Sequence, residues 1–260
     1  VYYYKYNYLY GFKANETLAG HVDMINFSDI QNLYDYENND RKESYLGRVR
    51  YVLDDKYALE GSFRRDGSSR FHKDHRWGNF YSIGASWILS REEFIRKYDW
   101  INNLKLRAAY GMTGNDASVY LTNPTFVQAF ATTTYNSDAI LFPFNGTNAF
   151  MAAATLGSGS LRPEMTSEAE VGLNLQFFGG RLGLDATYYH RITKDQIFTL
   201  PVDPSTGYNT MVTNFGKVRN TGFELVLNTT PVKTKNFQWN LDFNVARNWN
   251  TVLELPDGLD

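Results

Sequence analysis

The chain has 260 residues, and its 26 basic and 28 acidic side chains give a net charge of −2 at pH 7. This balance offers no electrostatic basis for binding nucleic acid, and the absence of cysteine excludes disulfides and thiolate metal sites. The mean hydropathy is −0.45, and the sequence has no run of about 18 apolar residues. This excludes a helical membrane span but not a membrane β-barrel, whose alternating strands average out as polar.

The composition favours strands, because 19 Tyr, 18 Phe and 5 Trp accompany 20 Gly and only 7 Pro. Segments with a period of two recur along the chain. In residues 57–66, Leu59 and Phe63 fall on one face, and Glu60 and Arg64 fall on the other. This pattern predicts about nine strands, at residues 1–10, 44–53, 57–66, 77–88, 104–110, 168–177, 182–188, 218–229 and 237–245.

The connections between these strands alternate between short and long. Residues 54–56 and 179–181 form brief turns, whereas residues 112–165 and 195–216 are long connections. A barrel in an outer membrane has this asymmetry. The sequence therefore predicts an all-β fold, an antiparallel transmembrane β-barrel segment with short periplasmic turns and long extracellular loops. A soluble β-sandwich, whose strands also alternate, is the alternative fold.

Residues 90–102 are the one convincing helical segment. Ser90 can cap the N-terminus of a helix, and Glu92 and Glu93 suit its first turn. In a barrel this helix would lie on the side of the short turns.

No motif in the sequence carries enzymatic chemistry. His72 and His75 have a spacing that could hold a transition metal, but no third ligand or helical frame accompanies them. Ser158 lies in a Gly-Ser-Gly-Ser loop and has no evident His or Asp partner. The sequence therefore predicts no catalytic residue, no metal site and no cofactor.

Several blocks of the sequence resemble a known family. In chain order they are RRDGSSRF at 64–71, RWGNF at 76–80, NLKLRAAYGMTGN at 103–115, LRPE at 161–164, STGY at 205–208 and NFGKVRNTGFEL at 214–225. These blocks resemble the SusC/RagA family of TonB-dependent outer-membrane transporters of Bacteroidetes. Because they follow one another in order, the resemblance extends over most of the chain.

The resemblance implies that residues 1–260 are part of the C-terminal transmembrane β-barrel domain, about nine strands of a 22-stranded barrel that an N-terminal plug fills. The plug, the TonB-binding segment and the final strands are expected to lie outside this sequence. The implied function is import of oligosaccharides or peptides, together with a SusD-like surface lipoprotein that acts as a lid. The TonB complex would act through the absent N-terminal region, and outer-membrane lipid would surround the barrel.

The same resemblance suggests roles for individual residues. The strand alternation directs four charged side chains into the lumen, where they would face the plug: Arg64, Arg107, Glu168 and Glu170. The long connection at 112–165 is rich in aromatic residues that would contact ligand or lid, among them Tyr120, Phe126, Tyr135 and Phe144. Two other functions stay open, a soluble β-rich carbohydrate-binding module and a passive outer-membrane porin.

Overall fold

A single curved sheet dominates the chain in a computed structural model. The structure describes residues 2–13, 31–123, 125–128, 130–132, 139–141 and 149–255. Ten strands of this described part form the sheet, nine of which pair with antiparallel neighbours. The nine are β1 (Tyr2–Lys13), β2 (Gln31–Leu53), β3 (Tyr57–Ser68), β4 (Trp77–Ile88), β5 (Ile101–Asn115), β11 (Glu164–Phe177), β12 (Leu182–Pro201), β13 (Thr210–Lys233) and β14 (Gln238–Glu254).

Minor elements lie in the connections between these strands. The tenth strand of the sheet, β10 (Thr155–Leu156), pairs in parallel with the start of β13. Two small ribbons and three short helical segments complete the described structure. They are β6 (Phe126–Gln128) with β9 (Phe150–Ala152), β7 (Phe130–Thr132) with β8 (Ala139–Leu141), η2 (Leu89–Arg91), α1 (Glu93–Arg96) and η3 (Pro204–Thr206).

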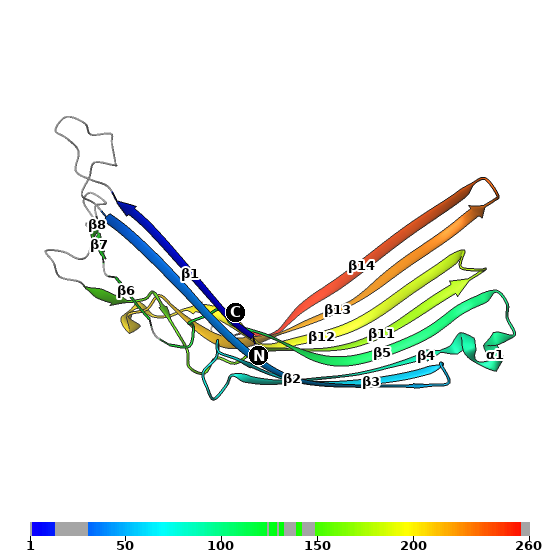
Figure 1. The fold of residues 1–260 in the computed structure, drawn as a ribbon, viewed down its shortest axis with the longest axis horizontal. Coiled ribbons are helices and arrows are strands. Elements are labelled where there is room, and N and C mark those ends of the chain that lie inside the picture. Colours follow the sequence, from blue (N-terminus) through cyan, green and yellow to red (C-terminus); the bar gives the residue numbers. More distant parts are fainter. Residues whose placement is uncertain are drawn as a thin grey trace.

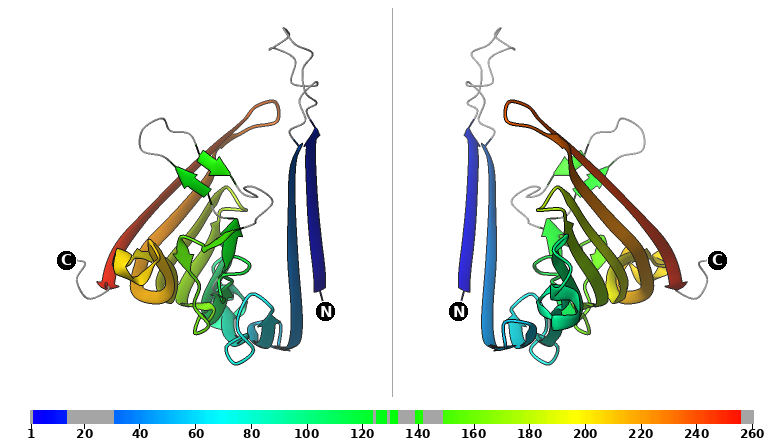
Figure 2. Two further views of the ribbon diagram at one scale, coloured as in Figure 1. Left: turned by 90° about the vertical axis from the view of Figure 1, so that its left-hand side faces the viewer. Right: turned by 90° about the vertical axis from the view of Figure 1, so that its right-hand side faces the viewer.

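The sheet curls from β1 to β14 as an open arc, which is visible when it is viewed along the strands (Figure 2). Long strands can curl in this way because each is twisted relative to its neighbours. The predicted antiparallel barrel segment of about nine strands is therefore confirmed, and within the described residues the arc does not close on itself.

The outer face of the sheet is apolar and exposed. The exposed fractions of Val49, Tyr51 and Leu59 are 74%, 61% and 51%. The register pairs these residues side by side, with Tyr51 opposite Leu59 and Leu53 opposite Tyr57. A soluble sandwich would cover such a face with a second sheet. No sheet packs on this face in the described part of the chain, so its apolar side chains are arranged as in a lipid-facing wall.

The two ends of the sheet differ in their connections, as predicted. Figure 1 shows the β2–β3, β4–β5, β11–β12 and β13–β14 connections at one end, and the loops that carry β6 to β9 at the other. The β2–β3 turn is tight because Asp54 and Asp55 both have a φ of 52°, in the left-handed region, and the Lys56 N–H donates to the Leu53 carbonyl at 3.0 Å. The predicted long connection at 195–216 is mostly strand, because β12 and β13 extend into it and leave only 202–209 as a loop.

The predicted helix over 90–102 is much shorter than expected, since α1 has four residues and β5 begins at Ile101. The Glu92 carboxylate does not cap this helix. It accepts hydrogen bonds from Tyr57 Oη at 2.6 Å and Trp87 Nε1 at 3.0 Å, and forms an ion pair with Lys56 Nζ at 3.0 Å. The hydrogen bond from Tyr57, followed by those from Trp87 and Lys56, lowers the pKa of Glu92 from 4.5 to about 2. The segment is thus fastened to the β2–β3 turn instead of continuing as a helix.

A small hydrophobic core, here called the loop core, lies at the opposite end of the sheet. Its members are Phe71, Ala117, Leu161 and Val212, each at most 3% exposed. They come from the β3–β4 connection, from both ends of the β5–β11 connection, and from β13. Arg70 adds polar links, because its guanidinium donates to Asp40 Oδ2 at 2.9 Å and to the Ala117 carbonyl at 3.0 Å. The loops are therefore packed against one another at their base.

Candidate functional site

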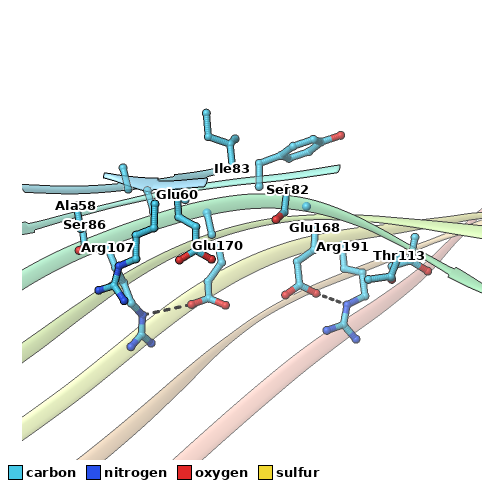
Figure 3. A pocket seen from close by; sticks show the side chains of 18 of the residues that line it. Ala58, Glu60, Ser82, Ile83, Ser86, Arg107, Thr113, Glu168, Glu170 and Arg191 are labelled. Carbon is cyan, nitrogen blue, oxygen red and sulfur yellow. Dashed lines mark hydrogen bonds and ion pairs between the residues drawn. The ribbon is translucent and has the colours of Figure 1, made fainter. Parts of the chain in front are cut away.

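The inner face of the sheet is the candidate functional site, because it gathers the charged side chains that strand alternation directs away from the apolar face. Arg107, Glu168 and Glu170 line one open cavity of about 900 Å³, whose lining residues come from seven strands, β2 to β5 and β11 to β13. Figure 3 shows these side chains pointing to the same side of the sheet, whereas Ile83 points to the other. The register explains this arrangement, since Glu170 is opposite Ala109 and Arg107 is opposite Gly172.

Arg107 is the centre of an ion-pair network. Its Nε lies 3.3 Å from Glu170 Oε1, and its Nη2 lies 3.3 Å from Asp185 Oδ1. It also donates to Asn174 Oδ1 at 3.4 Å and to the Thr187 hydroxyl. The guanidinium therefore spans β5, β11 and β12 and fixes their relative position on the inner face.

A glycine makes room for this network. Gly172 lies directly opposite Arg107, and a Cβ at that position would collide with the Nε of Arg107. The absence of a side chain lets the guanidinium lie flat across β11 toward Asp185 on the next strand. The network thus depends on a glycine as well as on charged residues.

Glu168 has its own partner on the neighbouring strand. The register places Arg191 opposite it, and the two side chains form a short ion pair, which Figure 3 marks. Both side chains stay partly exposed, at 29% for Glu168 and 47% for Arg191. A partly exposed pair is worth little stability in itself, but it retains oxygen and nitrogen atoms that can bond to a further partner in the lumen.

Arg64 lies on the same face but lines a different cavity, of about 310 Å³, nearer the loops. Its Nε lies 2.6 Å from Asp66 Oδ2. The structure thus brings Arg107, Glu168 and Glu170 together and leaves Arg64 apart from them.

The four aromatic residues singled out in the long connection fall in two groups. Tyr120 is 49% exposed, with a φ of 63°, and its hydroxyl accepts a hydrogen bond from the Asn39 backbone N–H at 2.9 Å. Phe126 is 71% exposed on the β6–β9 ribbon. Tyr135 and Phe144 lie outside the described residues.

Sequence reasoning did not predict which side chains pair with one another on the inner face. Arg191, Asp185 and Asn174 belong to it, and so do Arg48 and Glu60, whose ion pair spans 2.7 Å. Strand alternation assigns Glu60 to the polar face, and it assigns the other four residues in the same way. Their pairing could not be predicted, because it depends on the register between strands.

Two further features concern metals and membrane helices. Within the described ranges, no group of three or more His, Cys, Asp or Glu side chains is arranged to hold a metal ion. His72 Nδ1 instead lies 3.2 Å from Asp74 Oδ2 in the β3–β4 connection. Among the residues that the structure describes, no helix is long and apolar enough to cross a membrane.

The sheet has an apolar outer face, a charged inner face and connections of unequal length, as the wall of an outer-membrane barrel does. Comparison with known proteins supports the same assignment. The family described as "TonB dependent receptor-like, beta-barrel" matches residues 2–257. The chain belongs to the TonB-dependent receptor β-barrel family. Members of this family are outer-membrane transporters and receptors rather than enzymes.

Individual relatives confirm the resemblance to SusC and RagA. The TonB-dependent receptor SusC of Bacteroides thetaiotaomicron is 33% identical over 257 residues, which is 96% of this chain and 24% of SusC. The TonB-dependent receptor P39 of Formosa agariphila is 35% identical over 219 residues, or 82% of this chain and 20% of that protein. The chain thus spans about a fifth to a quarter of the length of these relatives.

Two solved structures share the fold of this chain. The RagAB peptide importer in its closed-closed state superposes with a TM-score of 0.82 over 99% of this chain and 28% of the importer chain, at 23% identity. The siderophore receptor PirA from Pseudomonas aeruginosa superposes with a TM-score of 0.54 over 84% of this chain and 37% of that receptor, at 16% identity. These likenesses show the barrel fold.

Proposed function

We propose that this TonB-dependent receptor barrel imports oligosaccharides or peptides across the outer membrane together with a SusD-like surface lipoprotein. The observation that carries the proposal is the contrast between the two faces of one sheet. The apolar face suits lipid, while the inner face presents paired charges around a cavity of about 900 Å³. RagAB, which shares the fold, is a peptide importer, and this supports import as the task and peptides as one class of cargo.

We further propose that residues 1–260 form part of a larger barrel domain, which contains a plug and a TonB-binding segment in other parts of the protein. Within the described residues β1 pairs only with β2, and β14 pairs only with β13. Each therefore presents a row of backbone groups without a neighbouring strand, which lipid cannot satisfy. Pairing of these edges with other strands of the same barrel would satisfy them.

The inner-face charges are proposed to hold the plug. Arg107 and Glu170 are 33% and 34% exposed, and Glu168 is 29% exposed, so each can accept or donate bonds toward the lumen while it keeps its strand partner. Arg64 would make the same kind of contact nearer the loops, since its side chain is 56% exposed. Charge-assisted hydrogen bonds of this type orient a domain without a large apolar contact.

The loop aromatics are proposed to contact the cargo or the lipoprotein lid. Phe126 and Phe150 are 71% and 68% exposed on the β6–β9 ribbon. Two exposed phenylalanines on a short ribbon are typical of an interaction surface, because aromatic side chains dominate the energetics of interfaces and stack on sugar rings. Tyr120 would make the same kind of contact, and the proposal includes Tyr135 and Phe144, which lie outside the described residues.

The test uses the full-length transporter that contains this chain, purified with its lipoprotein and reconstituted in planar bilayers. The plugged transporter should be closed, whereas a passive porin would conduct, and a soluble carbohydrate-binding module would not insert at all. The double variant R107A/E168A should loosen the plug, detected as conductance and as faster proteolysis of the plug, and should reduce uptake.

The matched control is E93A/R96A, which removes one carboxylate and one guanidinium from α1 outside the inner face. This control should leave conductance and uptake unchanged. If R107A/E168A behaves like the control, the inner-face charges do not hold the plug. If the wild-type protein conducts freely, the transport proposal itself is wrong.

A further inference from the structure

A cluster of cations lies on the lipid-facing side of the sheet, where charge is unexpected. Lys194 on β12 is opposite Lys217 on β13, and Arg219 follows Lys217 by two residues. These positions share a face with the apolar Tyr188 and Phe223, because residues two apart on a strand point the same way. With Arg247, which β14 places opposite Phe223, they form what is here called the outward basic patch.

The patch is not neutralised by the chain. Among the described residues, Lys194, Lys217, Arg219 and Arg247 form no ion pair with a carboxylate. The inner-face arginines 48, 64, 107 and 191, by contrast, all do. Two lysines directly opposite each other on neighbouring strands repel and so destabilise the sheet. Such a pair is accounted for if an anion from outside the chain lies between or beside the two ammonium groups.

The surroundings of the two lysines form a shallow polar cavity of about 320 Å³. Arg162 adds a third cation to its lining, although that guanidinium is already 2.6 Å from Asp195 Oδ1. Glu254, opposite Lys217, is the remaining carboxylate of the cavity, and it forms no ion pair within the described part of the chain. The cavity thus has two ammonium groups and one unpaired carboxylate.

Neighbouring aromatic residues locate the patch relative to the membrane. Trp249 is 44% exposed, its ring centroid lies 6.0 Å from that of Phe223, and Arg247 Cζ lies 4.9 Å from the tryptophan ring centroid. Exposed tryptophans on a barrel wall mark the headgroup level. Lys217 lies four residues beyond Thr221, the partner of Trp249, and therefore roughly 13 Å farther toward the loops. Arg219 and the two lysines thus lie beyond Trp249, on the side of the long connections, whereas Arg247, opposite Phe223, lies on the other side of Trp249.

We propose that the outward basic patch is a lipid-binding site, which takes the phosphate groups of a phosphorylated glycolipid in the outer leaflet. Lys194 and Lys217 supply point charges to a phosphate, and Arg219 and Arg247 supply guanidinium forks, the two kinds of group that bind phosphate best. The acyl chains of the same lipid would lie along the apolar side chains of β12 and β13, including Tyr188 and Phe223. This inference needs only the outer-membrane location and does not rest on transport.

The experiment measures binding of diphosphorylated lipid A to the intact transporter in detergent, by native mass spectrometry and by titration of a fluorescent lipid A. The variant K217Q/R219Q removes two cations from the patch. Near a membrane surface each cation contributes about 1 kcal/mol, so the loss of two should weaken binding roughly 30-fold. The control R96Q/K97Q makes the same change of charge at α1, at the opposite end of the sheet, and should bind as the wild type does.

Three further readouts keep the outcome decisive. The exchange variant K217R/R219K keeps both charges and should retain binding, which separates loss of charge from a folding defect. Fully dephosphorylated lipid A should bind at least tenfold more weakly than the diphosphorylated form, and equal binding overturns the phosphate assignment. Inorganic phosphate at millimolar concentration should not displace the lipid; if it does, the site is one for free phosphate and the lipid assignment is wrong. An equal loss of lipid A binding in K217Q/R219Q and in the control R96Q/K97Q would also overturn the proposal.

Discussion

Replacement of Phe71 by alanine should open the packed loops without unfolding the barrel wall. Phe71 is 1% exposed and lies in the loop core with Leu161 and Val212, which are 0% and 2% exposed. Truncation of a buried phenylalanine to alanine costs about 3–5 kcal/mol, because the lost transfer energy adds to the energy of the cavity left behind. The loop core contains few other buried residues that could collapse into that cavity.

The expected result can be expressed as an exchange rate. If the loops open locally, a cost of about 3–5 kcal/mol accelerates amide exchange in residues 69–76 and 155–163 by between about a hundredfold and a few thousandfold. Exchange in β3 and β4 should be unaffected, because their hydrogen bonds belong to the sheet. The assay is hydrogen–deuterium exchange of the intact transporter in detergent, read by mass spectrometry.

The matched control is Phe126→Ala, which removes the same side chain from a position that is 71% exposed. It should leave exchange in both loop segments unchanged, since no buried contact is lost. Similar exchange in the two variants, or an acceleration that spreads into β3 and β4, would refute the idea that the loop core is a separate unit of stability.

Three further predictions concern the sheet and its short-turn end. Gly222→Ala should destabilise the protein by about 1–3 kcal/mol in urea unfolding. A Cβ there would lie 2.5 Å from the Arg247 carbonyl oxygen and 2.5 Å from the Tyr189 hydroxyl. An unchanged urea midpoint would contradict this close approach of the β14 backbone to Gly222. Gly172→Ala should cost less stability than Gly222→Ala, since the Arg107 side chain can move away from the new Cβ. It should nevertheless loosen the plug as R107A/E168A does. If the plug is retained tightly, the ion-pair network of Arg107 does not hold it. The pKa of the Glu92 carboxylate is lowered to about 2, so its stabilising effect is complete above pH 4.5 and is lost as the pH falls toward 2. The difference in unfolding free energy between wild type and Glu92→Gln should therefore shrink over that interval. A constant difference would exclude the linkage.

Strand alternation predicted the barrel wall well, because the two faces of each strand meet different surroundings. Leu59 and Glu60 illustrate this, because an apolar side chain suits the lipid-facing position and a charged side chain suits the lumen-facing one, so the alternation is visible in the sequence. The same logic placed Arg107, Glu168 and Glu170 on one face. Their common cavity depends on the register of seven strands, which no local pattern specifies.

The failures of sequence reasoning have tertiary causes. The helix over 90–102 was predicted from local signals such as Glu92, but that carboxylate bonds to Tyr57 and Trp87 from neighbouring strands instead. The extension of β12 through Pro201 was also missed, because its last residues pair with β13 beyond the alternating region. Local propensity is a weak prior where side chains from elsewhere in the chain offer stronger contacts.

The pairing of β10 with β13 has a consequence for the order of folding. Thr155 and Leu156 join the sheet beside Thr210 and Met211, residues that belong to the part of β13 beyond the reach of β14. This contact closes a loop of more than fifty residues, whereas the β11–β12 and β12–β13 hairpins close after short turns. Because the entropic cost of closing a loop grows with its length, the hairpins should form first and the β10 segment should pair with β13 last. Changes at β10 should therefore speed the detachment of the loops and leave the rate of barrel assembly unaltered.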